Sequence, residues 1–480
     1  MNAPNPELTA KVKRLYDVGE QGVLRFITCG SVDDGKSTLI GRLLYDSKLI
    51  LEDHLAALSR DSRKFGTTGD DMDFALLLDG LEAEREQGIT IDVAYRFFAT
   101  ERRKFIVADT PGHEQYTRNM ATGASTADLA ILLVDARKGV LPQTRRHTYI
   151  VNLLGIKNIV LAINKMDLVD YSSATYHQIM ADYLTVAEQL GFESILAVPI
   201  SARNGDNVSF KSENTPWYEG PTLIERLETI DVETDLREHP FRLPVQWVNR
   251  PNLDFRGFSG TVTSGVVRPG DRVAVSKSGR TSRIKEIATA DGDLDHAEAG
   301  QAVTLVLEDE IDISRGDVLA AADARPEISD QFAARIIWMH EEPLLPGRSY
   351  LFKAGAQATP GSITALKHKV DIETYDPQPA TTLELNEIGL CNIEMTRPIA
   401  FDPYSELRDT GSFVIIDRFT NQTVGAGMIQ HGLRRATNIH HQHLDVDKTR
   451  RSELKDQTPA IVWFTGLSGA GKSTIANMVE

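Results

Sequence analysis

The phosphate-binding pattern G-x-x-x-x-G-K-[ST] occurs near the start of the chain. It is met by Gly30-Ser31-Val32-Asp33-Asp34-Gly35-Lys36-Ser37, between the strand-like run RFITC and the helix-like run STLIGRLLY. In this setting the glycines let backbone N–H groups turn toward phosphates, and the helix N-terminus adds positive potential. We expect Lys36 to reach the β- and γ-phosphates as a catalytic contact and the Ser37 hydroxyl to ligate Mg²⁺. The pattern predicts a nucleoside triphosphate site.

A second group of residues that could bind Mg²⁺ and the γ-phosphate follows the run KFIVA. It reads Asp109-Thr110-Pro111-Gly112-His113. At the end of a strand, Asp109 is expected to hold Mg²⁺ through water, and the Gly112 N–H to bind the γ-phosphate and so to sense its loss. His113 lies one residue beyond this sensor, within reach of an attacking water. We therefore predict a catalytic role for His113, against the alternative of an ordinary surface histidine.

The third motif, Asn164-Lys165-Met166-Asp167, follows the run NIVLAI and concerns the base. The Asp167 carboxylate can accept hydrogen bonds from N1–H and from the exocyclic amine of guanine, whereas adenine has neither donor in that place. The site is therefore expected to select GTP over ATP. Ser201 and Ala202, at the end of the run AVPI, are expected to direct a backbone N–H at the guanine O6.

A long segment separates Lys36 from Asp109 and ends in EREQGITID. Thr90 in this stretch is the candidate for completing Mg²⁺ coordination near the γ-phosphate. Long inserts of this kind are often functional, and one reading is an element that orders on GTP and is released on hydrolysis. A plain solvated helix over residues 48–87 is the alternative, and the sequence leaves both open.

These motifs need a scaffold, and the hydrophobic pattern predicts a parallel sheet. Short apolar runs alternate with helix-forming stretches in VLRFITCG, KFIVADT, LAILLVDA, NIVLAINK and SILAVPIS. This rhythm is typical of strands with crossover helices. Later runs alternate apolar and polar residues with Gly and Pro between them, as in small all-β barrels. The predicted order is an N-terminal tail (1–21), an α/β P-loop GTPase domain (22–232), two all-β barrel domains (238–330 and 331–432) and a charged linker (433–458).

The amino-acid composition of the chain argues against some classes of binding partner and location. The chain has 480 residues with 52 basic and 68 acidic side chains, a net charge of −16. This balance works against a broad electrostatic contact with nucleic acid or with an anionic membrane surface. Two cysteines are too few for a disulfide framework, and the most apolar run, LAILLVDA, is too short to span a bilayer. Because the first residues also contain no apolar targeting segment, we expect a cytoplasmic protein.

The assembled motifs resemble those of the translational class of GTPases, in which elongation factor Tu has the same GTPase-barrel-barrel order. Within that class, residues 22–440 are most similar to the GTPase (large) subunits of heterodimeric bacterial sulfate adenylyltransferase, or ATP sulfurylase. The most specific stretches are GSVDDGKSTLIGRLLYD, DGLEAEREQGITIDVAYRFF, DTPGHEQYTRNMATGASTADLAILLVDARKGVLPQTRRH and NKMDL.

The resemblance implies a function. In that family, GTP hydrolysis drives the synthesis of adenosine 5′-phosphosulfate from ATP and sulfate, which a smaller adenylyltransferase subunit performs. The expected partner is this small subunit, with no nucleic acid and no membrane. The resemblance also implies that Asp33 helps to hold a monovalent cation near the phosphates, with an ordinary surface acid as the alternative.

A second phosphate-loop match lies at the C-terminus, with Gly466, Gly471, Lys472 and Ser473 at its defining positions. It resembles the opening of adenosine 5′-phosphosulfate kinase, an arrangement that occurs as a fusion in this family. Residues 459–480 are expected to be a truncated start of that kinase, inactive in this chain. ATP is expected at this loop only in a full-length fusion.

Two other functions remain as alternatives. A translation-factor-like GTPase would bind charged RNA and the ribosome, against which the acidic net charge weighs. A non-catalytic scaffold would use its nucleotide only to stabilise structure, against which His113 beside Gly112 weighs. A metal site at His440, His441 and His443 is less well supported than a solvated linker, since no carboxylate or cysteine spacing accompanies these histidines.

Overall fold

The computed structural model describes residues 22–47, 74, 92–232, 236–252, 255–433 and 475. The chain forms two compact units, Met1–Leu433 and Arg434–Glu480, and all described residues except Ile475 lie in the first. The predicted sites Thr90, Gly466, Gly471, Lys472 and Ser473, and the histidines at 440, 441 and 443, lie outside the described residues. Among the described residues, no helix combines the length and apolar character needed to cross a bilayer.

The first domain is built on a six-stranded sheet with the order β2-β3-β1-β4-β5-β6. All neighbouring strands are parallel except β2, which is antiparallel to β3. The bounds are β1 Val23–Cys29, β2 Ala94–Ala99, β3 Lys104–Asp109, β4 Leu129–Asp135, β5 Asn158–Asn164 and β6 Ser194–Pro199. Strands β4 and β5 are buried along their whole length, as expected of continuous apolar runs covered on both faces.

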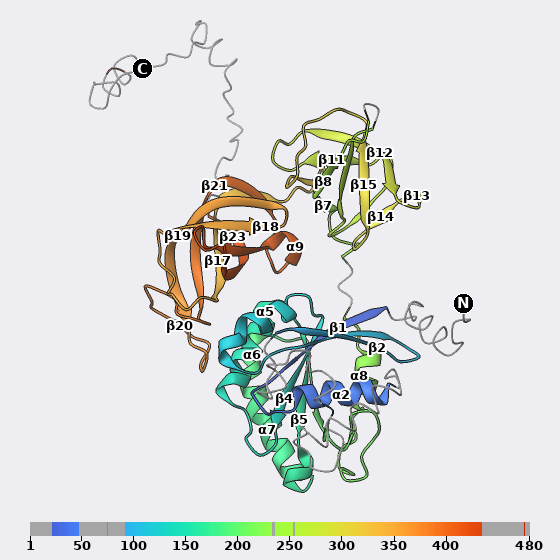
Figure 1. Ribbon diagram of the computed structural model, residues 1–480, viewed down its shortest axis with the longest axis vertical. Helices are drawn as coiled ribbons and strands as arrows, with labels where there is room; N and C mark the ends of the chain where they lie inside the picture. The colour runs from blue at the N-terminus through green and yellow to red at the C-terminus, as the bar shows by residue number, and fades with distance from the viewer. Residues whose placement is uncertain are drawn as a thin grey trace, which may run out of the picture. The chain divides into compact units, whose positions relative to one another are not determined.

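Helices cover both faces of this sheet (Figure 1). Residues of α2 and α8 pack with one set of strand side chains, and residues of α5, α6 and α7 pack with the other set. The bounds are α2 Lys36–Asp46, α5 Thr117–Ala124, α6 Pro142–Leu153, α7 Ser173–Ala187 and α8 Leu223–Thr229, with short 3₁₀ helices η2 Glu114–Tyr116, η3 Met166–Val169 and η4 Glu188–Leu190. The five predicted strands and the layered α/β arrangement are thus confirmed.

Strand β2 is an addition to the predicted parallel sheet. Its sequence AYRFFA forms an antiparallel hairpin with β3, with Phe97 opposite Ile106. Phe98 packs against Phe105 and Phe26 in the core, whereas Tyr95 and Phe97 on the other face are exposed. β2 is therefore an edge strand whose large side chains are buried on one face only.

The next domain is a small barrel, referred to below as the first barrel. Its strands follow the order β7-β16-β11-β12-β15-β9-β8, and β13 pairs with β12. Because β7 and β8 are successive pieces of one extended stretch, the sheet closes on itself. The bounds are β7 Arg242–Pro244, β8 Trp247–Asn249, β9 Gly257–Thr261, β10 Val266–Val267, β11 Arg272–Val275, β12 Thr281–Thr289, β13 Gly292–Asp293, β14 Ala297–Glu298, β15 Ala302–Leu307 and β16 Val318–Ala321.

The second barrel follows directly. Its order is β18-β22-β23-β17-β21-β19-β20, and an additional pairing of β18 with β19 closes it. β17 begins at Glu327, ahead of residue 331, where the sequence placed the start of this domain. Strands β22 and β23 form an antiparallel hairpin. The bounds are β17 Glu327–Trp338, β18 Ser349–Ala354, β19 Gln357–Val370, β20 Pro377–Gln378, β21 Ile388–Phe401, α9 Arg408–Gly411, β22 Ser412–Ile416 and β23 Thr423–Gly432.

Candidate nucleotide-binding site

The three motifs meet at the carboxyl edge of the parallel sheet. β1 ends at Cys29 just before the phosphate loop, β3 ends at Asp109, and β5 ends at Asn164, while Ser201 closely follows the end of β6. Carboxyl ends of parallel strands lie at one edge of a sheet, which is where open α/β sheets bind ligands. The fold therefore brings together residues that are far apart in the sequence.

The phosphate loop joins β1 to α2 in a conformation that its glycines permit. Gly35 caps the start of α2 in the left-handed region, with φ 92°, and an added Cβ there would overlap the Asn164 amide. The Lys36 ammonium folds back into the loop, where Nζ donates to the carbonyls of Gly30 at 3.1 Å and Ser31 at 2.8 Å. A Cβ at Gly112 would overlap this same ammonium. Lys36 therefore lies between the phosphate loop and the predicted γ-phosphate sensor.

The charged side chains of Lys36 and Asp109 in this site are buried. Burial lowers the pKa of the Lys36 ammonium, and the carboxylates of Asp109 and Asp34 oppose that shift. Burial likewise raises the pKa of Asp109, against Lys36 and the hydroxyls of Ser37 and Thr28. Both shifts arise because desolvation disfavours the charged form. A phosphate beside Lys36 and a cation beside Asp109 would replace the hydration that these groups have lost.

The predicted magnesium ligands are adjacent. The Ser37 hydroxyl donates to Asp109 Oδ2 at 2.9 Å, so one hydroxyl and one carboxylate converge at the start of α2. Mg²⁺ binds oxygen ligands and commonly takes one or two carboxylates together with phosphate oxygens. No cluster of three or more His, Cys, Asp or Glu side chains suited to a metal ion occurs among the described residues. The oxygen donors present fit Mg²⁺ held jointly with a nucleotide.

Asp34 is a loop residue of the motif whose side chain does not face solvent. Its side chain is buried inside the loop, and Oδ2 accepts from the Ser31 N–H at 2.6 Å. Its Oδ1 atom and the Ser31 hydroxyl oxygen are buried with no hydrogen-bond partner within the described structure. The neighbouring Asp33 has φ 66° and an exposed side chain. The Asp34 carboxylate therefore organises the loop from within.

The base motif is tied to the phosphate loop. Asn164 Nδ2 donates to the Asp34 carbonyl at 2.8 Å, and its Oδ1 accepts from the Ala202 N–H at 2.9 Å. Lys165 donates through Nζ to the Asp33 carbonyl. Met166 is fully buried, whereas Asp167 is half-buried. The amide of Asn164 thus connects the phosphate loop with the turn that was predicted to read the guanine O6.

Asp135, at the end of β4, is a site residue that the sequence did not single out. Its carboxylate pairs with Lys165 at 3.0 Å and with Arg137 at 2.7 Å. Burial opposes ionisation here, but the hydrogen bonds from Arg137 and Lys165 prevail and hold the pKa of Asp135 well below its usual range. Asp135 therefore fixes the position of Lys165 beside the phosphate loop.

His147 on α6 is a second residue that the sequence did not indicate. Its Nδ1 lies 3.2 Å from the Gly30 nitrogen and accepts that N–H, and its Nε2 lies 3.0 Å from the side-chain amide of Gln143. Burial, with Lys36 and Arg146 nearby, lowers the pKa of His147 to about 3, so the ring is neutral. Because Nδ1 accepts, the proton of the neutral ring is on Nε2.

The candidate catalytic group is placed at the surface of the site. Thr110 is buried and donates from its hydroxyl to the Thr28 carbonyl at 2.6 Å, which fixes the strand end before Pro111 and Gly112. His113 follows as an exposed residue whose ring lies 6.2 Å from that of Tyr116. Its neighbour Gly112 lies beside the Lys36 ammonium, where the γ-phosphate is predicted to bind. The exposed His113 ring is therefore accessible next to that position.

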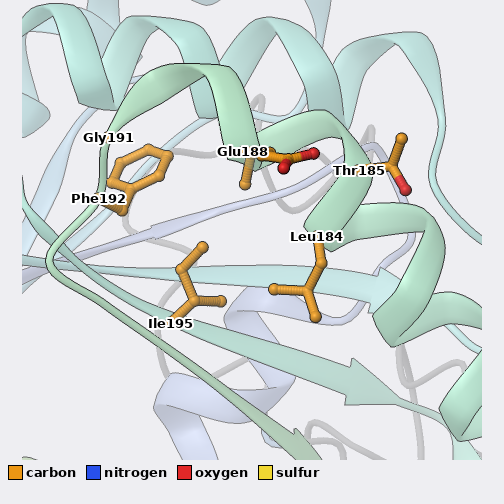
Figure 2. Close-up of a pocket in the computed structure, with 7 residues that line it drawn as sticks. Leu184, Thr185, Glu188, Gly191, Phe192 and Ile195 are labelled. Carbon is orange, nitrogen blue, oxygen red and sulfur yellow. The ribbon is translucent and has the colours of Figure 1, made fainter.

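A shallow apolar groove lies at the other edge of the sheet, at the end of α7 and the start of β6 (Figure 2). Glu188 is the sole ionisable residue in its lining, which consists of Leu184, Thr185, Ala187, Glu188, Gly191, Phe192 and Ile195. Ile195 is near the amino end of β6, whereas the motif residues follow the carboxyl ends of the strands. The groove is therefore separate from the nucleotide site.

Models of known families match every domain. The elongation factor Tu GTP binding domain matches residues 21–241, the elongation factor Tu domain 2 matches residues 258–320, and the GTP-eEF1A C-terminal domain-like family matches residues 331–430. Residues 458–480 match the adenylylsulphate kinase family. These matches confirm the predicted fold class of a GTP-binding α/β domain followed by two β domains.

Whole-chain relatives define the family more closely. The bifunctional enzyme NodQ of Rhizobium sp. (strain N33) is 64% identical over 96% of this chain and 71% of its own length. The bifunctional enzyme CysN/CysC of Xylella fastidiosa is 57% identical over 95% and 74%. Sulfate adenylyltransferase subunit 1 of Aeromonas salmonicida is 59% identical over 87% and 89%. The chain belongs to the family of GTP-binding proteins that contains sulfate adenylyltransferase subunit 1 and the NodQ and CysN/CysC bifunctional enzymes.

Proposed function

We propose that this chain is the GTP-hydrolysing subunit of a sulfate adenylyltransferase. The observation that carries the proposal is the joining of Lys36, Ser37 and Asp109 with the base motif through Asn164 in one site. Such a site can hold both ends of a guanine nucleotide. The relatives named sulfate adenylyltransferase subunit 1 supply the reaction to which its hydrolysis is coupled.

The residues divide the chemistry among them. Lys36, desolvated and already directed into the loop, stabilises negative charge on the β- and γ-phosphates. Ser37 and Asp109 would hold Mg²⁺, which when bound neutralises charge that develops on the phosphates. The Gly112 N–H senses the γ-phosphate, and His113 orients the attacking water. Asp167 selects guanine through N1–H and the exocyclic amine.

Loss of the γ-phosphate releases the contacts at Gly112 and Thr90 and so changes the segments that contain them. We propose that this change drives the formation of adenosine 5′-phosphosulfate from ATP and sulfate on a partner subunit. The name subunit 1 of the Aeromonas relative implies that such a partner exists for that protein. For this chain we propose the small adenylyltransferase subunit as partner, with neither nucleic acid nor membrane involved.

Two further ligands belong to the proposal. The exposed side chain of Asp33 would help to hold a monovalent cation near the phosphates, and an ordinary surface acid remains the alternative. ATP would bind at the loop of Lys472 and Ser473 in a full-length fusion, as the match of residues 458–480 to adenylylsulphate kinase suggests.

The test is reconstitution of the coupled reaction. The purified chain is mixed with a small adenylyltransferase subunit, ATP, sulfate and Mg²⁺, with and without GTP, while adenosine 5′-phosphosulfate and phosphate are measured. We expect GTP to raise the yield of adenosine 5′-phosphosulfate above its level without GTP, and Lys36→Ala to abolish that gain. A yield that does not respond to GTP would exclude coupling. GTP-dependent binding of charged RNA would instead support a translation factor.

A further inference from the structure

One side chain outside the three motifs contacts the turn at the base site. Arg42 lies on α2, in the turn of helix after the phosphate loop, and its guanidinium reaches the turn of residues 201–206, called the base turn below. Its Nη1 donates to the Arg203 carbonyl at 3.3 Å. The guanidinium also lies so close to Gly205 that a Cβ there would overlap it. Gly205 has φ 88°, a conformation that suits glycine.

The guanidinium is fixed from its other sides as well. Its Nε donates to Asp46, one helical turn further along α2, at 3.0 Å, and the side chains of both residues are nearly buried. The Ser209 hydroxyl donates to the same carboxylate at 2.5 Å. The ring of Phe74 lies 5.6 Å from the guanidinium carbon, within the range of a cation–π contact. Arg42 therefore has one position, which the helix and the segment after the base turn both determine.

The base turn is thus held on two sides. From inside the domain, Asn164 accepts the Ala202 N–H at 2.9 Å, and from the α2 side Arg42 donates to the carbonyl of the following residue, Arg203. Within the turn, the Gly205 N–H donates to the Ser201 carbonyl at 2.7 Å. Two external contacts on adjacent residues fix both the position and the orientation of the peptide groups between them.

We infer that Arg42 is a positioning residue for guanine recognition, which holds the base turn where a backbone N–H of this turn can reach the O6 of the base. The inference rests on the proposed binding of GTP. Asp167, which is on a different loop, reads N1–H and the exocyclic amine, next to O6 on the same edge of the base. Loss of the guanidinium should therefore weaken O6 recognition and leave amine recognition intact.

The experiment separates these two features with nucleotide analogues. Affinities of Arg42→Met for GTP, 6-thio-GTP and ITP are compared with those of the parent chain. Sulfur in place of O6 is a weak hydrogen-bond acceptor, and ITP lacks the exocyclic amine. We expect the preference for GTP over 6-thio-GTP to fall roughly three- to tenfold, the value of about one hydrogen bond. The preference for GTP over ITP should stay as in the parent.

Controls distinguish the possible outcomes. Arg272→Met, at an exposed arginine of the first barrel, should change neither preference. Ser209→Ala removes a single hydroxyl and should lower the same O6 preference to a smaller extent, which keeps the test valid if Arg42→Met does not fold. An unchanged 6-thio-GTP preference in folded variants, or equal losses of both preferences, would overturn the role of Arg42. A parent chain that does not distinguish GTP from ITP would instead contradict the proposed guanine site.

Discussion

At the scale of single residues, Asp167 is the residue proposed to determine which base is accepted. In Asp167→Asn, one accepting oxygen of the carboxylate becomes an amide NH2 donor, which matches the 2-carbonyl of xanthine better than the exocyclic amine of guanine. We expect the affinity for GTP to fall roughly 10- to 100-fold, because hydrogen bonds to charged groups are lost. Affinity for xanthosine triphosphate should rise. Equilibrium binding with fluorescent nucleotides measures both, and an unchanged preference for GTP would remove Asp167 from the base site.

His113 is the residue on which hydrolysis is expected to depend. Its ring is exposed beside Gly112, so truncation leaves the phosphate loop and the base motif unaltered. His113→Ala should bind GTP as the parent does and hydrolyse it about 10²–10⁴-fold more slowly, since water is positioned only on the way to the transition state. Single-turnover hydrolysis in the presence of the partner subunit measures this. A rate equal to that of the parent would show that His113 is an ordinary surface residue without a catalytic role.

His147 links the stability of the nucleotide site to pH. Its pKa is about 3 in the folded chain and near 6.5 when exposed, so the folded state binds fewer protons between these values. The stabilisation is fully present above pH 6.5 and is lost as the pH falls toward 3. Between pH 6.5 and 5 this amounts to roughly 2 kcal/mol.

The measurement is urea denaturation of the parent and of His147→Asn at pH 7 and pH 5. The asparagine carbonyl can still accept the Gly30 N–H but does not titrate in this range. We expect the loss of unfolding free energy between the two pH values to be smaller in the variant. Equal losses in both chains would show that His147 does not take up a proton on unfolding.

At the scale of elements, helix α6 and the loops at the amino edge of the sheet contact the second barrel. The Tyr375 hydroxyl donates to the Arg145 carbonyl at 2.9 Å, and Arg335 donates to the Tyr149 hydroxyl at 3.0 Å. The Tyr404 hydroxyl donates to the Leu154 carbonyl at 3.2 Å. Buried side chains of both domains form one hydrophobic cluster here. The same helix contacts the phosphate loop through His147, so α6 connects that loop with the second barrel.

Arg408, at the start of α9, also makes polar contacts across this interface. Its guanidinium donates to the Ala127 carbonyl at 3.1 Å and also to the Gly155 carbonyl, in two separate loops of the GTP-binding domain. Arg408→Met leaves both carbonyls without this charged donor and should cost about 1.5–3 kcal/mol of unfolding free energy. Urea denaturation measures the loss. Arg397→Met, at an exposed arginine of the same barrel, is the matched control and should be neutral.

At the scale of the whole molecule, a buried ion pair joins the two barrels. Arg242 of β7 binds Asp402 through two hydrogen bonds, Nε at 3.0 Å and Nη2 at 2.9 Å. The Thr410 hydroxyl donates to the same carboxylate at 2.9 Å, and Arg242 also donates to the Ala324 carbonyl at 2.7 Å. Through Ala324 the pair also contacts the stretch between β16 and β17, which connects the two barrels.

Removing one member of this pair should lower the unfolding free energy more than replacing both members with apolar residues. Asp402→Ala leaves the Arg242 charge buried without its counter-ion and should lower the unfolding free energy by about 3–5 kcal/mol. The double variant Arg242→Met with Asp402→Leu should regain much of that loss, because no unpaired charge remains. Urea denaturation of both chains, with limited proteolysis to follow the barrels, measures the difference. A double variant less stable than Asp402→Ala would contradict this account.

The sequence by itself determined the parts of the site that depend on neighbours along the chain. The phosphate loop, Asp109 with Gly112, and Asn164 with Asp167 each lie directly after a strand whose continuous apolar run is visible in the sequence. Because parallel strands end at one edge of a sheet, predicting the strands also predicted that these motifs would meet. The change from helical to alternating periodicity likewise predicted the two barrels.

Tertiary structure alone decided which residues support those motifs. Gly30 meets His147 across 117 positions of sequence, and Arg42 meets Arg203 across 161. Neither His147 nor Arg42 belongs to a spaced motif, since a hydrogen bond across such distances requires only that packing bring two groups together. Asp34 and the edge strand β2 are similar cases, because their burial depends on the elements around them. Local spacing predicts the residues proposed to contact the nucleotide, whereas the packed fold determines which other groups hold those residues in place.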